Sequence, residues 1–176
     1  MINGLKIVGR KNRETFMSEL THFNEEGRAR MVDVSEKEIT TRIAKATATV
    51  TVNADTYALI KEGKMKKGDV LQVAQVAGIM GAKRTPDIIP MCHPIQITNV
   101  DIAFEMNDSD CSIKIISTAK CDGKTGIEME AMSAASIAAL TIYDMCKAVQ
   151  RDIRISDIYL LEKDGGKSGH YQYKES

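Results

Sequence analysis

Tryptophan is absent from this sequence of 176 residues, and all aromatic residues together make up only 5% of it. Proteins that read single-stranded nucleic acids use aromatic side chains as stacking platforms, so this scarcity argues against such a function. Net charge is lacking as well, because 24 Lys and Arg residues balance 24 Asp and Glu residues. Without a general basic surface, neither a nucleic-acid partner nor a membrane partner is predicted.

The sequence also lacks a C-x-x-C pair and a long apolar segment near its N-terminus. It has four cysteines, all far apart: Cys92, Cys111, Cys121 and Cys146. This pattern predicts reduced thiols in a cytoplasmic protein rather than a disulfide framework. The apolar stretch over residues 131–149 approaches the length of a membrane span, but it contains Asp144 and Lys147. We therefore expect a buried helix of a globular protein there.

Hydrophobic residues make up 43% of the chain, which is enough for a folded core. The length fits one domain, which buries roughly 70% of its unfolded surface. Residues 1–20 have neither a helical nor a strand period, so we expect an unstructured arm or a leader from an upstream start codon. In the second case Met17 is the native start. Residues 21–176 are expected to form a single domain.

Hydrophobic periodicity and turn residues predict alternating strands and helices. Strands are expected over residues 44–52, 95–105, 112–120 and 155–162, with a hairpin turn at 106–111. Helices are expected over residues 54–61, 70–83 and 127–151. Asn53 and Asp69 are predicted to cap the first two helices, and Pro86 to end the second. Without the inserted second helix, the order is β-α-β-β-α-β. This order predicts an α+β, ferredoxin-like antiparallel sheet that helices cover on one face.

The helix predicted over residues 127–151 is alanine-rich and apolar on nearly every side between 131 and 149. We expect it to be buried against the sheet and against a second surface, for which another subunit is a reasonable candidate. Asp144 and Lys147 lie three residues apart and therefore share a face. Glu130, Ser133 and Arg151 project within about 40° of Asp144, which predicts a polar seam along the helix.

Two interpretations of the Asp144–Lys147 pair stay open at this point. A pair on the outer surface contributes little to stability. A pair that faces a water-poor pocket titrates as a coupled acid-base unit and has catalytic potential.

The segment Pro90-Met91-Cys92-His93-Pro94 is held non-helical by its prolines, which would fix His93 in space. Neighbours in an extended chain point to opposite faces, so Cys92 and His93 do not converge as a nucleophile and its base. A metal site is not favoured either, because no second ligand follows at a metal-binding spacing. The alternative to a functional histidine is a loop histidine bonded to the backbone.

Two segments resemble the end of a phosphate-binding loop: Gly123-Lys124-Thr125 and Gly166-Lys167-Ser168. Neither has the glycine that such a loop needs five positions before its Gly-Lys step. Residues 124–126 nevertheless open a helix, whose free N–H groups favour an anion. Basic residues also occur near other predicted turns: Lys66, Lys67, Lys83 and Arg84. A polyanionic small ligand accounts for them, and ordinary solvated side chains are the alternative.

Eight segments carry, in collinear order, a resemblance to one family: residues 31–35, 67–70, 77–79, 82–85, 89–94, 123–131, 138–148 and 165–169. Together they resemble the MoaC family, the cyclic pyranopterin monophosphate synthases of molybdenum cofactor biosynthesis. The likeness extends from about Leu20 to the C-terminal tail. Residues 1–16 have no counterpart.

The resemblance implies a lyase that converts 3′,8-cyclo-7,8-dihydroguanosine 5′-triphosphate into cyclic pyranopterin monophosphate and diphosphate. It also implies that residues 21–176 are a catalytic domain, assembled as a hexamer (a trimer of dimers) with active sites between subunits. By motif, Asp144 and Lys147 are the central catalytic pair and Lys67 is a second catalytic lysine. The other implied positions bind substrate: Met91, Cys92, His93, Glu128, Met129 and Glu130, with Lys83, Arg42 and Lys167 on the triphosphate.

The implied reaction has no redox step, so no cofactor is expected, and Mg²⁺ would enter only with the substrate phosphates. Two other classes of protein are compatible with the same residues. A nucleotide-binding regulatory module would bind its ligand without converting it. A metal-dependent phosphohydrolase would lose its activity on chelation and would release phosphate from ordinary GTP.

Overall fold

The computed structural model describes Arg28 and residues 31–174. The chain divides into two units, Met1–Val34 and Ser35–Ser176, and all the described helices and strands belong to the second unit. The arm or leader predicted for residues 1–20, the start at Met17 and the domain boundary at residue 21 lie outside the described residues.

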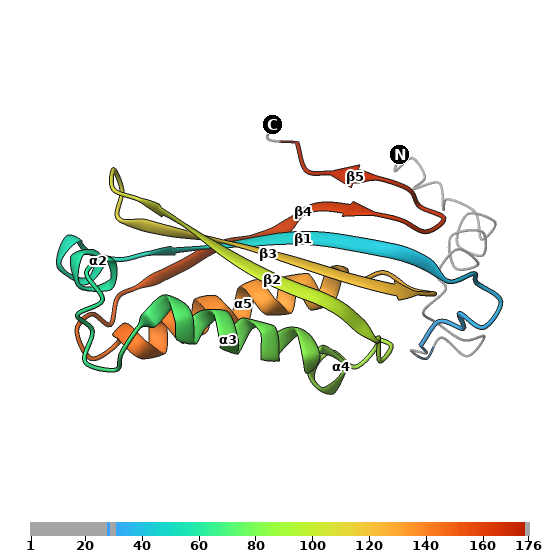
Figure 1. Ribbon diagram of the computed structural model, residues 1–176, viewed down its shortest axis with the longest axis horizontal. Coiled ribbons are helices and arrows are strands. Elements are labelled where there is room, and N and C mark those ends of the chain that lie inside the picture. The colour runs from blue at the N-terminus through green and yellow to red at the C-terminus, as the bar shows by residue number, and fades with distance from the viewer. Residues whose placement is uncertain (1–27, 29–30, 175–176) are drawn as a thin grey trace, which may run out of the picture. The chain divides into compact units, whose positions relative to one another are not determined.

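The second unit contains one antiparallel sheet with the strand order β2-β3-β1-β4-β5 (Figure 1). Its strands are β1 (Thr40–Thr51), β2 (Ile97–Asn107), β3 (Ser112–Gly123), β4 (Arg154–Asp164) and β5 (Tyr171–Gln172). The two-residue strand β5, which was not predicted, pairs with the edge of β4. The other strands and two long helices follow the β-α-β-β-α-β order, so the α+β, ferredoxin-like prediction is confirmed. The helix outside this order is the one over residues 54–61 and not, as predicted, the one over residues 70–83.

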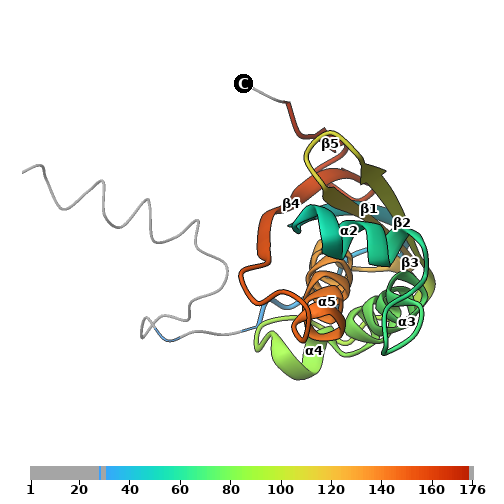
Figure 2. The same ribbon diagram turned by 90° about the vertical axis from the view of Figure 1, so that its left-hand side faces the viewer.

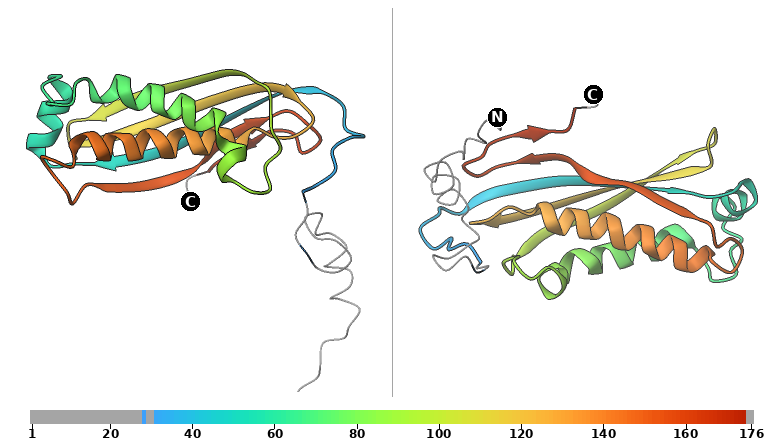
Figure 3. Two further views of the ribbon diagram at one scale, coloured as in Figure 1. Left: turned by 90° about the horizontal axis from the view of Figure 1, so that it is seen from below. Right: turned by 180° about the vertical axis from the view of Figure 1, so that it is seen from behind.

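Four helices are described: α2 (Ala54–Lys61), α3 (Val70–Lys83), α4 (Thr85–Ile88) and α5 (Glu128–Cys146). The two long ones, α3 and α5, lie side by side on the same face of the sheet (Figures 2 and 3). The predicted caps are confirmed, because the Asn53 side chain accepts from the Thr56 N–H and the Asp69 side chain from the Gln72 N–H. These caps satisfy N–H groups that the first turn of a helix leaves free.

Helix α5 ends at Cys146, earlier than the predicted end at Arg151. The amides of Val149 and Gln150 both turn back to the Cys146 carbonyl, at 2.8 and 3.1 Å, and this closes the helix. The short helix α4 was not predicted. Pro86 is tolerated in its first turn because the first N–H groups of a helix have no partner within it.

Small side chains line the contact between the sheet and α5. Ala44, Ala46 and Ala48 of β1 are fully buried, as are Ala134 and Ala138 of α5. Alanine opposite alanine allows the helix axis to approach the sheet closely. The alternation predicted for β1 is therefore the alternation between this buried face and the outer face of the sheet.

The second surface against α5 is α3 of the same chain. A side chain at Gly78 would lie 2.8 Å from the Ala134 carbonyl oxygen, and one at Gly81 would lie 2.8 Å from Cγ1 of Ile137. Only glycine fits where the two helices are this close. The burial of α5 therefore does not by itself indicate another subunit, which was our candidate for this second surface.

Helix α3 does not bury the face that carries its larger apolar residues. Val73, Val76 and Met80 recur with a helical period but are 44, 63 and 46% exposed. The buried residues are smaller: Val70, Ala74, Gly78, Gly81 and Ala82. Close packing against α5 selects the small side of the helix and leaves an apolar stripe on the surface.

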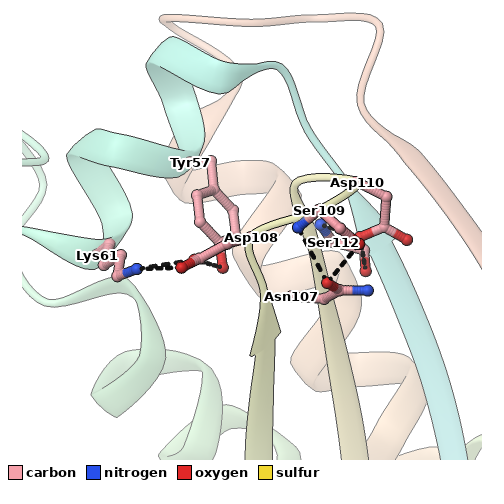
Figure 4. A network of polar contacts seen from close by, with 7 residues as sticks. All are labelled: Tyr57, Lys61, Asn107, Asp108, Ser109, Asp110 and Ser112. Atoms are coloured by element: carbon pink, nitrogen blue, oxygen red, sulfur yellow. Dashed lines mark hydrogen bonds and ion pairs between the residues drawn. The ribbon is translucent and has the colours of Figure 1, made fainter.

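A polar network ties the hairpin between β2 and β3 to α2 (Figure 4). The Asp108 carboxylate accepts from the Tyr57 hydroxyl at 2.8 Å and from the Lys61 ammonium at 2.7 Å. These bonds lower the pKa of Asp108, chiefly through Lys61. Burial and the same contact raise the pKa of Tyr57 to about 12. The network therefore stays intact at neutral pH and holds the hairpin against α2.

None of the helices in the described part of the chain combines the length and apolarity needed to cross a lipid bilayer.

Candidate active site

One carboxylate binds two lysines at the C-terminal end of α5. The Lys147 ammonium lies 2.6 Å from Oδ1 of Asp144, as expected for a pair one helical turn apart. The Lys67 ammonium, from the loop between α2 and α3, lies 2.9 Å from Oδ2 of the same carboxylate. Both oxygens of Asp144 are thus engaged, each by a different lysine. We call Lys67, Asp144 and Lys147 the lysine–aspartate cluster.

Lys67 is also held by the backbone of α5. Its ammonium donates to the Asp144 carbonyl oxygen at 2.7 Å. The last carbonyls of a helix have no partner within it, and the negative end of the helix dipole favours a cation there. The end of α5 therefore positions Lys67 through two acceptors of one residue.

The two lysines shift the acid-base equilibrium of the cluster. Hydrogen bonds from Lys147 and then Lys67 lower the pKa of Asp144 from 3.8 to about 2, and the bond to Asp144 raises the pKa of Lys147. At neutral pH, Asp144 is therefore an ionised acceptor and Lys147 a protonated donor. Two ammonium groups and one carboxylate leave one surplus positive charge, which suits an anionic ligand.

Within the single chain, the cluster does not lie in a water-poor pocket. The side chains of Lys67, Asp144 and Lys147 are 45, 55 and 52% exposed. Of the two interpretations of the Asp144–Lys147 pair, the isolated chain matches the exposed one.

A second group of predicted site residues gathers at the other end of α5. Glu130, in the first turn, is only 2% exposed. Burial raises the pKa of Cys92, and the charge of Glu130 raises it further. The Cys92 thiol therefore stays protonated. Met91, Cys92 and His93 lie half-buried between α4 and β2, and Glu128 and Met129 are half-buried beside Glu130. Lys83 is exposed at the last turn of α3.

Arg42 and Lys167 line a cavity of about 390 Å³. The other residues that line it are Glu36, Lys37, Glu38, Thr40 and Gly166. The Arg42 Nε–H donates to the Gly123 carbonyl oxygen at 2.9 Å, at the end of β3. Thr40 was not identified from the sequence, and its buried hydroxyl has no hydrogen-bond partner among the described residues. In a strand so rich in threonine, no sequence signal distinguishes it from its neighbours.

The prediction of one polar seam along α5 is wrong, because its residues do not share one surface of the helix. Glu130 and Asp144 are fourteen residues apart on α5, which is about 21 Å along the axis at 1.5 Å per residue. Glu130 is buried and Asp144 is exposed, and Arg151 lies beyond the end of the helix. One chain therefore carries two separate groups of predicted site residues, one at each end of α5.

Glu130 has a carboxyl oxygen free for a ligand. Its Oε1 is buried and has no hydrogen-bond partner among the described residues. Burial raises the pKa of Glu130, and the nearby charge of Glu128 raises it further. A buried polar atom without a partner is costly, so a ligand that donates a hydrogen bond here would be favoured.

We expect Glu130→Gln to raise the free energy of unfolding at about pH 8 but not at about pH 4. A carboxyl whose pKa is raised in the folded state favours folding while it is protonated, and this contribution is lost as the pH rises through that pKa. Glutamine is neutral at both pH values, so the variant does not lose this contribution to stability as the pH rises. Denaturant titrations of both proteins at the two pH values measure the difference. Glu105→Gln, at an exposed position on β2 away from Glu130, is the control. An equal change at both pH values would contradict the expectation.

Among the described residues, no group of three or more His, Cys, Asp or Glu side chains is placed to hold a metal ion. The four cysteines are free, and Cys121 and Cys146 are buried. Burial raises the pKa of Cys146 to about 11, so this thiol, near Lys67, is not a nucleophile at neutral pH.

The fold and the lysine–aspartate cluster define an α+β protein in which two lysines bind one carboxylate at the end of a helix. Residues 31–166 match the model of the MoaC family, and the chain belongs to this family.

Curated relatives that bear the name cyclic pyranopterin monophosphate synthase match nearly the whole chain. The protein of Lysinibacillus sphaericus is 56% identical over 160 residues, which is 90% of this chain and 100% of the relative. The protein of Peptoclostridium acidaminophilum is 61% identical over 154 residues, 88% of this chain and 97% of the relative. That of Clostridium acetobutylicum is 60% identical over 157 residues, 89% of this chain and 98% of the relative.

Proposed function

We propose that this protein is a cyclic pyranopterin monophosphate synthase of molybdenum cofactor biosynthesis. It converts 3′,8-cyclo-7,8-dihydroguanosine 5′-triphosphate into cyclic pyranopterin monophosphate and diphosphate. The observation that carries the proposal is the lysine–aspartate cluster, in a chain that is 54–61% identical to relatives bearing this enzyme's name.

The cluster has the groups that this rearrangement needs. Opening the dihydropurine ring and building the pterin ring require protons to be removed and returned. We assign the ionised Asp144 carboxylate as the proton acceptor and the Lys147 ammonium as the proton donor. Their ion pair makes the carboxylate a weaker base and the ammonium a weaker acid, so the bound substrate has to loosen this pair before protons move. The C-terminal end of α5 holds Lys67 beside these two groups, because the Lys67 ammonium donates to the Asp144 carbonyl oxygen. The three groups are coupled, so a proton that one of them loses changes the proton affinity of the others.

The second half of the reaction is a phosphoryl transfer. A ribose hydroxyl attacks the α-phosphate, the bond to the β-phosphate breaks, and diphosphate leaves with the electron pair. Negative charge develops on the leaving group, and cationic side chains stabilise it. Arg42 and Lys167, which line the 390 Å³ cavity, are the proposed contacts of the triphosphate. Lys83 is proposed to join them, while Glu130 and the segment 91–93 bind the rest of the substrate.

We also propose that the protein works as a homohexamer, a trimer of dimers, with each site assembled from two protomers. The two groups of site residues at opposite ends of α5 support this, because one small substrate does not reach both ends in one chain. The exposed stripe of Val73, Val76 and Met80 on α3 provides an apolar surface for subunit contact.

Mixing two inactive variants tests the shared site. Asp144→Asn removes the cluster and Arg42→Ala removes the other group, so each variant alone is expected to be inactive. Mixed protomers form some sites from two intact halves, and about a quarter of the wild-type activity is expected for random pairing in dimers. Activity is measured after the variants are unfolded and refolded together, with each variant refolded alone as the control. No recovery by a mixture of the same oligomeric state would refute the shared site.

No resident cofactor is proposed, and Mg²⁺ is proposed to enter only with the substrate phosphates. The proposed compartment is the cytoplasm, where free thiols remain reduced.

The function itself is tested by incubating the protein with the cyclic dihydro-GTP substrate. The expected products are diphosphate and a pterin that oxidation makes fluorescent. Substrate that binds but remains unchanged would instead indicate a regulatory module. Release of phosphate from ordinary GTP, abolished by EDTA, would indicate a metal-dependent phosphohydrolase.

A further inference from the structure

Arg42 is held on two sides by backbone. On one side, its Nε–H donates to the Gly123 carbonyl oxygen at 2.9 Å, across the pairing of β1 with β3. On the other side lies Gly166, in the loop between β4 and β5. A Cβ atom at Gly166 would lie 2.8 Å from Cζ and 3.0 Å from Nη2 of Arg42, and closer still to Nη1. The guanidinium group therefore occupies the space in which any other residue at position 166 would place its side chain.

The same loop carries Lys167, and Arg42, Gly166 and Lys167 all line the 390 Å³ cavity. A guanidinium group binds phosphate oxygens through N–H groups in a fixed planar fork, so its orientation determines how well it binds. With Nε bonded to Gly123, the two terminal nitrogens remain for a ligand. A side chain at position 166 would displace them, because its Cβ atom would collide with the guanidinium group.

We propose that Gly166 is a positioning residue for Arg42. Because it has no side chain, it lets the guanidinium remain bonded to Gly123 and face the cavity beside Lys167. The inference rests on the proposed function, which assigns Arg42 to the substrate triphosphate.

The loop provides a matched control for this proposal. Gly166 has a φ of +73° and Gly169 has a φ of +63°, so alanine is strained at both positions. A Cβ atom at Gly169 meets nothing within 4 Å. The variants Gly166→Ala and Gly169→Ala therefore share the backbone strain and differ in the collision with Arg42.

The first measurement is the ¹⁵N NMR signal of the Arg42 Nε–H, assigned by its loss in Arg42→Ala. We expect this signal to shift and to exchange faster with solvent in Gly166→Ala, because its bond to Gly123 is broken. In Gly169→Ala it should match the wild type. An unchanged signal in Gly166→Ala would overturn the positioning role, whatever the activity.

The second measurement is the affinity for inorganic tripolyphosphate, by calorimetry. Gly166→Ala should weaken binding at least about tenfold, as the loss of charge-assisted hydrogen bonds does. Gly169→Ala should not change it, and the double variant Arg42→Ala/Gly166→Ala should bind no more weakly than Arg42→Ala alone. A further loss in the double variant would refute an action through Arg42.

The double variant also decides the case in which Gly166→Ala does not fold. The three atoms nearest to a Cβ atom at position 166 all belong to the Arg42 side chain, and the double variant removes them. Recovery of folding in the double variant therefore supports the collision, and failure to recover refutes it. Failure of the proposed function can be distinguished from failure of the positioning role. If the wild type binds no tripolyphosphate and makes no pterin, the triphosphate assignment fails, while the NMR signal still decides the positioning role.

Discussion

Asp144→Asn is expected to reduce turnover about a thousandfold, the scale on which a general acid-base group contributes to catalysis. Asparagine has nearly the same shape but cannot take up a proton as the ionised carboxylate does. The change also leaves the Lys67 and Lys147 ammonium groups, 2.9 and 2.6 Å from the carboxylate oxygens, without a negative charge between them. Steady-state assays of pterin formation at matched concentrations of folded protein measure the loss.

The fold should survive this change, because Asp144 is half-exposed and contributes nothing to the core. A circular dichroism melt close to that of the wild type is the expected control result. Asp152→Asn, at an exposed aspartate outside both groups of site residues, should keep full activity. Near-normal turnover by Asp144→Asn would remove the carboxylate from the mechanism.

Lys67→Ala is expected to lower the rate of the chemical step about a hundredfold while the affinity for substrate changes much less. In this variant, Asp144 keeps its bond to Lys147 but loses the second ammonium, so the pKa of Asp144 rises from about 2 toward its ordinary value. The proton balance of the cluster then changes, while Arg42 and Lys167 remain to bind the triphosphate. Single-turnover kinetics at saturating substrate separate the chemical step from binding.

Lys66→Ala is the matched control, because Lys66 is the exposed neighbour on the same loop. Its removal changes the net charge by the same amount and should leave the chemical step unaffected. If Lys67→Ala weakens substrate binding and leaves the single-turnover rate intact, Lys67 serves the phosphates and not the chemistry.

Local signals in the sequence were sufficient for helices α2, α3 and α5, for strands β1 to β4, and for the closest pair in the candidate site. The spacing of Asp144 and Lys147 places them on one turn of a helix wherever that helix packs. The caps at Asn53 and Asp69 are equally local, since each side chain bonds an N–H three residues away. The C-terminal boundary of α5 could not be predicted in this way, because residues 147–151 contain no glycine or proline that would end a helix.

Local sequence patterns did not predict which face of α3 is buried. Val73, Val76 and Met80 form the more hydrophobic stripe, yet the smaller side of the helix packs inside. The choice depends on how closely α5 approaches, and only the packed pair of helices sets that distance.

The sequence by itself determined the order of the elements, the family, and the pairing of Asp144 with Lys147, because helix and strand geometry act over a few residues of chain. Only the tertiary structure brought Lys67 to Asp144 across 77 residues and set Gly166 against Arg42. It also placed Glu130 and Asp144 at opposite ends of α5. Contacts between residues so far apart in the chain depend on how the sheet and helices pack, and no short stretch of sequence contains that information.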